Sequence, residues 1–270
     1  MKLNYHLTIL ATLTLLNPIW LVSAVNGEMK NWPLELAQAF RTPDIREAPP
    51  PNPGGGTRGG FLSREHKPTA LIPKTNIGLT LAEYPTFFVY LPGIEDLSEY
   101  LPAIEEIAEF WLADEAGTIY KTELKLPNTN GIVMINLPED GSIPPLAVGK
   151  VYQWGVELIP SVREEVYDFD ELLTSGWVKR IEISPNLLQE LQNTTPDNHP
   201  KVYAEAGIWH ETLDSLATLR QSNPNNSTFL TQWQDILESV GLENVANAPL
   251  LTDSNQPTET KQNQDTSDVR

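Results

Sequence analysis

The sequence predicts an α+β protein: an antiparallel β-sandwich of immunoglobulin-like type, followed by a small C-terminal helical segment. Three observations predict it. Short stretches of alternating apolar and polar residues recur before position 184. Turn residues separate them at spacings of roughly 10 to 15 residues, without helical patterns between them. After Ser184 the apolar spacing changes to three and four residues, which is typical of amphipathic helices.

The first 24 residues have the order of an export signal. Met1-Lys2 supplies a positive charge, an apolar run extends from Leu7 to Leu16, and Val22-Ser23-Ala24 has the small residues of a signal peptidase site. The apolar run is about half as long as the ~20 residues of a spanning helix. We therefore expect cleavage of residues 1–24 and a periplasmic or secreted protein without a membrane span. An uncleaved membrane anchor is the alternative.

Charge narrows the choice of partners. The chain of 270 residues has 36 acidic and 18 basic side chains, and loss of residues 1–24 removes one lysine, so the mature net charge is −19. Such a chain lacks the excess of Lys and Arg by which proteins bind nucleic acids, and it is repelled by anionic lipid. The charge favours solubility, with a cationic partner as the alternative.

The chain contains no cysteine. An exported protein without disulfides depends on burial for its stability, so we expect a substantial core. Zinc sites built on thiolates, iron–sulfur clusters and cysteine nucleophiles are excluded.

The two ends of the mature chain are expected to lie outside the folded part. Residues 25–60 are predicted to be flexible, because Pro and Gly dominate "RTPDIREAPPPNPGGGTRGG" from Arg41 to Gly60, although "NWPLELAQAF" before it can form one short helix. Residues 252–270 are polar without periodicity and are predicted to be disordered. The folded part is therefore residues 61–251.

Residues 61–183 are predicted to form the sandwich. The inward residues of two strands are Tyr120, Thr122, Leu124 and Leu126, and Tyr152, Trp154, Val156 and Leu158. Two nearly continuous apolar runs, Thr86 to Pro92 and Gly131 to Pro138, are typical of inner strands. The other expected features are a hairpin with its loop at Asp114 to Gly117, a turn at "PEDGS", and a last strand containing Trp177, Ile181 and Ile183.

Tyr152 stands at the entry to one of these strands, in "LAVGKVYQW". In immunoglobulin-like and fibronectin-type sandwiches a tyrosine at such a corner ties the chain back through its hydroxyl. A plain buried tyrosine is the alternative.

Residues 184–251 are predicted to be helical and to pack on the sandwich. Ser184 suits an N-cap and Pro185 the first helical position, with the helix ending near Asn193. Three further helices are expected at Lys201 to Ile208, Glu211 to Arg220, and Phe229 to Val240, the last ended by Gly241.

The stretch "AEAGIWHETLDSLATLR" resembles a zinc-hydrolase helix, with His210-Glu211 followed by Asp214. Such a helix needs a second His four residues after the first, and Asp214 occupies that position. We therefore predict no metal site, and interpret His210 as a solvated residue at a helix start, with Glu211 stabilised by the helix dipole. A mixed His–Asp site completed from elsewhere is the alternative.

The same stretch, continued to Asn225, resembles the back half of a tetratricopeptide repeat. Small residues let two helices approach, and Asn223-Pro224-Asn225 ends the second helix. One such hairpin cannot bury its own face, so it is expected either to pack on the sandwich or to recruit a helix from a partner.

Other catalytic or cofactor-binding motifs were not found. There is no Gly-x-Ser-x-Gly elbow, phosphate loop or dinucleotide fingerprint, so no catalytic residue and no cofactor is predicted. "YDFDELL" (Tyr167 to Leu172) has the acids of a calcium site but lacks its ligand count and turn glycine, and is interpreted as a solvated acidic edge.

Five longer motifs occur along the chain: "GGGTRGG" from Gly54, "TALIPKTNIGLTLAEYPTFFVYLP" from Thr69, "VGKVYQWGVEL" from Val148, "GWVKRIE" from Gly176 and "YAEAGIWHETLDSLATLR" from Tyr203. As a set, they resemble the motifs of the mostly cyanobacterial, exported proteins of domain of unknown function number 928. The resemblance covers about 190 residues in order and implies export and this architecture. It implies no catalytic residues, and the cysteines that family members often carry are absent here.

Taken together, the sequence favours a non-catalytic binding or assembly module of the cell envelope that contacts another envelope protein. The alternative is binding of a small molecule, glycan or cation at the sandwich loops. A deep pocket with converging carboxylates, or with His210 and Asp214 directed into it, would instead favour chemistry. A flat apolar patch near Trp209 and Trp233 would favour a protein partner.

Overall fold

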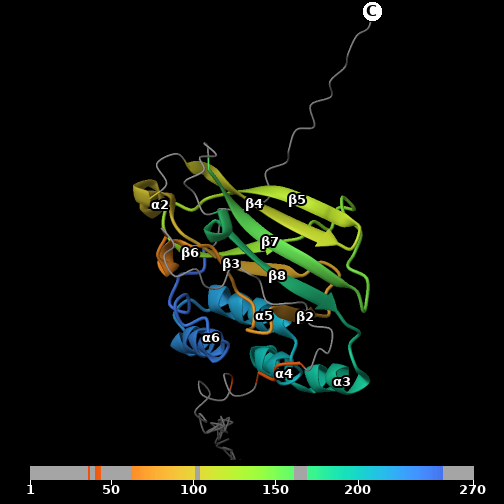
Figure 1. The fold of residues 1–270 in the computed structure, drawn as a ribbon. Helices are drawn as coiled ribbons and strands as arrows, with labels where there is room; N and C mark the ends of the chain where they lie inside the picture. The colour runs from red at the N-terminus through yellow and green to blue at the C-terminus, as the bar shows by residue number, and fades with distance from the viewer. Residues whose placement is uncertain (1–35, 37–39, 44–61, 101–103, 161–168, 252–270) are drawn as a thin grey trace, which may run out of the picture. The chain divides into compact units, whose positions relative to one another are not determined.

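The computed structural model describes residues 36, 40–43, 62–100, 104–160 and 169–251. All of them belong to one compact unit, Asn31–Arg270. In this part of the chain, two β-sheets of three and five strands are followed by C-terminal helices, so the α+β class is confirmed (Figure 1). The predicted signal segment and C-terminal tail lie outside the described residues.

The smaller sheet has apolar residues on both faces. Its strands are β1 (Thr69–Ala70), β3 (Thr86–Leu91) and β6 (Gly131–Asn136), in the antiparallel order β1-β3-β6. Phe87 and Val89 of β3 pack toward the larger sheet, while Phe88 and Tyr90 pack toward the helices. The sequence of β3 is nearly continuously apolar because both faces of the strand are covered, as expected for an inner strand.

The larger sheet has the order β2-β8-β7-β4-β5. The strands are β2 (Ile77–Thr80), β4 (Ile104–Asp114), β5 (Gly117–Lys125), β7 (Val151–Pro160) and β8 (Leu173–Arg180). The prediction of a wholly antiparallel sandwich is wrong for one pair, since β2 runs parallel to β8. β2 is followed directly by β3, which belongs to the other sheet. No hairpin therefore joins β2 to β8, and only a hairpin would require the two strands to be antiparallel.

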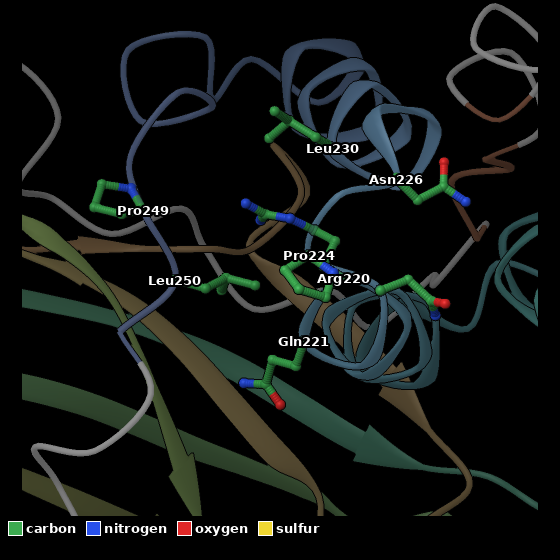
Figure 2. Close-up of a pocket in the computed structure, with 8 residues that line it drawn as sticks. Arg220, Gln221, Pro224, Asn226, Leu230, Pro249 and Leu250 are labelled. Carbon is green, nitrogen blue, oxygen red and sulfur yellow. The ribbon is translucent and has the colours of Figure 1, made fainter.

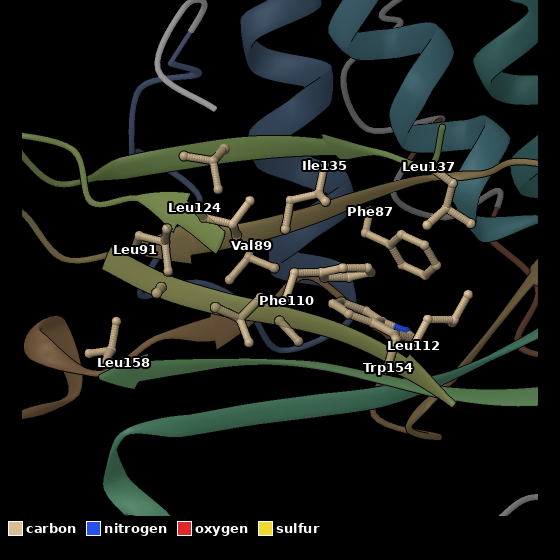
Figure 3. Close-up of a cluster of buried hydrophobic side chains, with 14 of the residues drawn as sticks. Phe87, Val89, Leu91, Phe110, Leu112, Leu124, Ile135, Leu137, Trp154 and Leu158 are labelled. Atoms are coloured by element: carbon tan, nitrogen blue, oxygen red, sulfur yellow. The ribbon is translucent and has the colours of Figure 1, made fainter. Parts of the chain in front are cut away.

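A core lies between the two sheets (Figure 3). Phe87, Phe110 and Trp154 meet at its centre, with ring centroids 4.7 Å apart for Phe87–Trp154 and 5.3 Å for Phe87–Phe110. The predicted inward faces of β5 and β7 contribute to it: Thr122, Leu124, Tyr152, Trp154, Val156 and Leu158 are all buried. These two period-two predictions are confirmed, except that Tyr120 of β5 is only half-buried.

The predicted turns are also present. Asp114 pairs with Gly117 at the end of the β4–β5 hairpin, and Asp114 Oδ1 accepts the N–H of Ala116 at 2.8 Å. In "PEDGS", Asp140 Oδ1 accepts the N–H of Ser142 at 2.8 Å. In both turns an aspartate replaces a backbone acceptor, which is how short polar side chains favour turns.

Tyr152 is tied back as its position predicts. The hydroxyl oxygen of this buried side chain accepts the backbone N–H of Ala147, five residues upstream, at 2.9 Å. The bond holds the entry to β7 against the preceding loop.

The last strand differs in detail from its prediction. β8 begins at Leu173 and ends at Arg180, and its side chain in the inter-sheet core is Val178. Trp177 is half-buried, Ile181 packs beside the first C-terminal helices, and Ile183 is exposed. Charged residues separate Trp177, Ile181 and Ile183 in the sequence, so the alternating pattern does not show where the strand ends.

The helices follow the predicted order with shifted bounds. They are α3 (Pro185–Asn193), α4 (His199–Glu205), α5 (Trp209–Ser222) and α6 (Ser227–Ser239), with short 3₁₀ turns at Arg64–His66, Phe169–Glu171 and Pro196–Asn198. Ser184 caps α3 as predicted, its side chain accepting the N–H of Leu187 at 3.2 Å. One helix was not predicted: α2 (Ile94–Tyr100) lies between β3 and β4 and buries only Leu97, too little for a recognisable apolar stripe.

Helix α6 ends where predicted. Gly241 has φ +85°, a conformation that residues with a Cβ rarely adopt, and the N–H of Leu242 bonds to the carbonyl of Leu237 at 2.9 Å. With the bond from Gly241 N–H to Glu238, this is the Schellman arrangement.

Helices α5 and α6 cover the second face of the smaller sheet (Figure 1). A second apolar cluster joins Leu213, Leu216, Trp233 and Leu237 of these helices to Phe88 and Ile132 of β3 and β6. Leu36 and Phe40 pack against the same cluster, although both fall in the range for which the sequence predicts flexibility. The centroids of the Phe40 and Trp209 rings are 5.0 Å apart. The N–H of Arg41 also bonds to the carbonyl of Ala204 of α4 at 3.0 Å, so apolar packing and a backbone bond together hold these residues on the helices.

Candidate binding site

His210 is buried, and the prediction that it is solvated is wrong. Only 4 % of its surface is exposed. Nδ1 lies 3.0 Å from the carbonyl oxygen of Thr86, which can only accept, so Nδ1 carries a proton. Burial lowers the pKa of His210 from 6.5 to about 4.

The reason lies in tertiary packing that the helix pattern does not reveal. Gly78 of β2 has no side chain, and a Cβ added there would stand 2.7 Å from Nε2 of His210. The imidazole fills that space and meets the Phe87 ring edge to face, with centroids 5.3 Å apart. If β2 had a side chain at position 78, the imidazole would have no space there, and His210 at the start of α5 would lie in solvent.

Glu211 lies in the first turn of α5, as predicted. Its carboxylate accepts hydrogen bonds from residues at and just after the end of β2. Oε1 accepts the backbone N–H of Leu81 at 2.7 Å, the N–H of Ala82 at 3.0 Å and the hydroxyl of Thr80 at 2.8 Å. Burial raises its pKa above the usual value, and these bonds only partly offset the rise. Glu211 therefore joins α5 to the end of β2.

The zinc-like trio does not converge. Asp214 lies one turn further along α5 and hydrogen-bonds to the side chain of Thr86, whose carbonyl His210 contacts, whereas Glu211 contacts the end of β2. Among the residues that the structure describes, no group of three or more His, Cys, Asp or Glu side chains is arranged to hold a metal ion. The absence of a metal site remains a prediction.

The acidic stretch "YDFDELL" is described from Phe169 onward. Asp170 is exposed, in agreement with a solvated edge, whereas Glu171 is buried and corrects that prediction. Its Oε1 lies 2.7 Å from Nζ of Lys67, and its Oε2 accepts the N–H of Leu62 at 3.1 Å. Glu171 thus fastens the start of the folded part to the larger sheet.

A cavity of about 350 Å³ opens where α5 ends, α6 begins and the chain passes through Pro249 and Leu250 (Figure 2). Four polar residues line it: Arg220, Gln221, Asn223 and Asn226. Its apolar wall is formed by Pro224, Leu230, Pro249 and Leu250. Among the described residues, no acid lines it.

Two of the segments that frame this cavity are held by hydrogen bonds. The N–H of Ile132 bonds to the carbonyl of Pro249 at 2.8 Å, and the N–H of Leu251 to the carbonyl of Ile132 at 2.9 Å, so the last described residues lie along the edge of β6. Asn226 caps α6, its Oδ1 accepting the N–H of Thr228 at 3.0 Å. The cavity is therefore formed before any ligand arrives.

Arg220 is the charged group of the cavity. Figure 2 shows its side chain extending between the Pro249–Leu250 segment and the start of α6. The guanidinium carbon lies 5.0 Å from the centre of the Trp233 ring, a cation–π contact. Burial lowers the pKa of Arg220 from its usual value.

No hydrogen bond or ion pair joins Arg220 to another described residue, and its Nη1 is buried without a partner. Nε1 of Trp233 beneath it is likewise buried without a partner within the described part of the chain. Trp233 does not line the cavity, so of these two donors only Arg220 can meet a bound acceptor. Buried donors are normally paired, so an arginine without a partner marks a place where an acceptor can bind.

Neither Trp209 nor Trp233 forms the flat apolar patch that would mark a protein partner. Both are fully buried, and Nε1 of Trp209 donates to the carbonyl of Leu71 at 2.8 Å. His210 and Asp214 do not line the cavity. The sequence criteria for chemistry and for an aromatic patch are thus both unmet in the described structure.

Sequence reasoning missed Arg220 as a site residue. It is the last basic residue of a helix, where Arg is common because it complements the helix dipole. Whether an arginine has a carboxylate partner depends on segments far apart in the chain, here α6 and the residues around Pro249. No local motif carries that information.

Among the described residues, no helix has the length and apolar character to cross a membrane. A search of the curated proteins finds no match to this chain. The family model described as Domain of Unknown Function (DUF928) matches residues 53–250, a range that contains each of the motifs from Gly54 to Arg220. Because this match spans most of the chain, the protein belongs to the DUF928 family.

Proposed function

We propose that the protein is a non-catalytic binding module of the cell envelope, periplasmic or secreted, that contacts another envelope protein through the cavity at Arg220. One observation carries the proposal: Arg220 has no carboxylate partner among the described residues, in a chain with 36 acidic and 18 basic side chains. An arginine surrounded by such an excess of acids and still unpaired is available to an external group.

The surroundings of Arg220 favour binding. Arginine stacked on an aromatic ring is preorganised, so less conformational entropy is lost when it engages a partner. Arginine is also enriched among the residues that contribute most to protein interfaces. The cavity walls are helix ends and a segment paired to β6, so they are rigid supports.

A small molecule is the second candidate ligand. A cavity of about 350 Å³ falls within the range of small-molecule pockets. The cavity lies between helices, so for this candidate we place the ligand there rather than at the sandwich loops.

We also propose two finer features of the fold: an immunoglobulin-like corner in the sandwich and a tetratricopeptide-like hairpin in the helices. The bond from Ala147 N–H to the Tyr152 hydroxyl supports an immunoglobulin-like corner. Buried Ala204 and Ala217, at the contact of α4 with α5, support a tetratricopeptide-like hairpin. The proposal also retains export by residues 1–24, in keeping with the cyanobacterial, exported proteins that the chain resembles.

The test is affinity capture from the host's own envelope fraction with tagged protein. Wild type should retain one defined envelope protein, identified by mass spectrometry, and Arg220→Gln should lose it. Arg64→Gln is the matched control, because Arg64 is exposed and does not line the cavity. Equal capture by wild type and Arg220→Gln would refute the proposal. Recovery of the protein in the cytoplasmic fraction would refute export.

A further inference from the structure

We propose that the cavity at Arg220 binds a carboxylate joined to an apolar group, as found at the C-terminus of a peptide that ends in an apolar residue or in a small organic acid. This inference rests on the proposed function, because it names the ligand of the same cavity. Its support is the charge, the apolar wall and the free hydrogen-bonding groups around Arg220.

The charge selects an anion. Arg220 is half-buried, and among the described residues its Nη1 has no partner and no acid lines the cavity. A guanidinium in such surroundings binds a carboxylate through two parallel hydrogen bonds, with little competition from water. Helix α6 adds to this preference, because its N-terminus carries the positive end of the dipole and its first turn contains no acid.

The apolar wall of the cavity favours a carboxylate that is attached to an apolar group. Leu230 is 41 % exposed although large and apolar, and it faces the same cavity as Pro249 and Leu250. An apolar ligand group would cover these side chains and gain free energy from the surface removed from water. A fully hydrated anion such as inorganic phosphate would leave them exposed, and it offers more charge than a single arginine neutralises.

The amide side chains can complete the site. Oδ1 of Asn226 is occupied by the N–H of Thr228, which leaves its Nδ2 donor available. Nδ2 of Asn223 is occupied by the carbonyl of Leu219, which leaves its Oδ1 acceptor available. Each amide therefore keeps one hydrogen-bonding group that its own helix end does not use.

The size of the cavity limits the ligand. About 350 Å³ is at the lower end of the range for ligand pockets, which suits a terminal residue or a short-chain acid rather than an oligosaccharide. One terminal group thus accounts for the charge, the wall and the volume together.

The experiment measures binding by titration calorimetry, using protein made from the full 270-residue chain. The probes are acetyl-Ala-Ala-Leu with a free C-terminus, the same peptide amidated, hexanoate, hexanol and inorganic phosphate. At least one carboxylate probe should bind, and its neutral counterpart should bind at least about tenfold more weakly, as expected for loss of a charged hydrogen bond. Binding of the free-acid peptide alone identifies a peptide terminus, and binding of hexanoate alone identifies a small organic acid.

Variants test the position of the site. Arg220→Gln should weaken carboxylate binding at least about tenfold, while Arg64→Gln should leave it unchanged. Helical circular dichroism of each variant reports whether it is folded. Equal binding of neutral and charged probes, tighter binding of phosphate, full affinity in Arg220→Gln, or no binding of either carboxylate at millimolar concentration would each overturn the inference.

The outcome is separable from that of the proposed function. If Arg220→Gln loses the captured protein but carboxylates neither bind nor compete, the cavity binds a partner of different chemistry. If carboxylates bind through Arg220 but capture is unchanged, the ligand class stands and the protein-binding function falls.

Discussion

Oε1 of Glu211 accepts the backbone N–H of Leu81 at a distance of 2.7 Å, which joins the first turn of α5 to the end of β2. The same oxygen accepts from Thr80 and Ala82. One carboxylate thus satisfies three donors at the point where the chain leaves the larger sheet. The helical layer is attached to the strands by a polar contact as well as by apolar packing.

Replacing Glu211 should reveal this attachment. Glu211→Ala removes the shared acceptor and should lower the free energy of unfolding by about 2 kcal/mol, because donors at a half-buried site lose their partner. Glu211→Gln retains the oxygen and should cost less than about 1 kcal/mol. Urea unfolding of both variants measures the difference. Equal losses would show that the negative charge, rather than the acceptor, holds α5 in place.

His210 should make the protein less stable in mild acid. Its folded pKa of about 4 lies below the ordinary value of 6.5. Between these values the unfolded chain binds a proton that the folded protein excludes, so stability decreases as the pH falls from 6.5 toward 4. The full loss is about 3 kcal/mol, and above pH 6.5 the group has no effect.

The control is His210→Gln, which can donate to the Thr86 carbonyl but does not titrate. Its stability between pH 7 and pH 4.5 should decrease less than that of wild type. Glu211 acts in the opposite direction, since its raised pKa favours proton uptake by the folded protein, and it is present in both chains. Parallel pH profiles of the two proteins would show that His210 is not the group responsible.

Arg220 should contribute little to stability. The variant Arg220→Met keeps the aliphatic part over Trp233 and removes an unpaired, half-buried charge. Loss of the cation–π contact and relief of desolvation should nearly cancel, leaving the free energy of unfolding within about 1 kcal/mol of wild type. Thermal unfolding checks this. A much larger loss would make Arg220 a structural residue instead of a binding residue.

Tyr152→Phe should destabilise the protein by about 1 kcal/mol, because the Ala147 N–H loses its acceptor while the buried ring is kept. Tyr100→Phe is the control, since Tyr100 is exposed. Chemical denaturation of both variants is the measurement. A loss no larger for Tyr152→Phe than for the control would reduce Tyr152 to a packing residue.

Calcium and zinc should leave the melting temperature of the protein unchanged, because His210, Glu211 and Asp214 are not arranged to hold an ion in the described structure. Scanning calorimetry with and without each metal tests this. A clear rise with either ion, reversed by a chelator, would reveal a site that the sequence prediction excludes.

Much of the architecture was predictable from local patterns. The inward faces of β5 and β7, the Asp114 turn, the Ser184 cap and the stop at Gly241 each depend on residues close together in the chain. Period-two and three-to-four spacings report which face of an element is buried, because the backbone geometry fixes where side chains point. The parallel pairing of β2 with β8 was not predictable, since its partners lie about a hundred residues apart.

The sequence by itself determined the class of fold, the order of strands before helices, the dependence on burial without disulfides and the excess of negative charge. The tertiary structure alone decided which polar groups are satisfied. Gly78 leaves room for His210, so a residue expected in water is enclosed. At Arg220 no carboxylate from any described segment approaches, so an ordinary helix-terminal arginine is left available for binding. Spacing along a chain fixes the direction of a side chain, whereas its partners come from segments that only folding brings together.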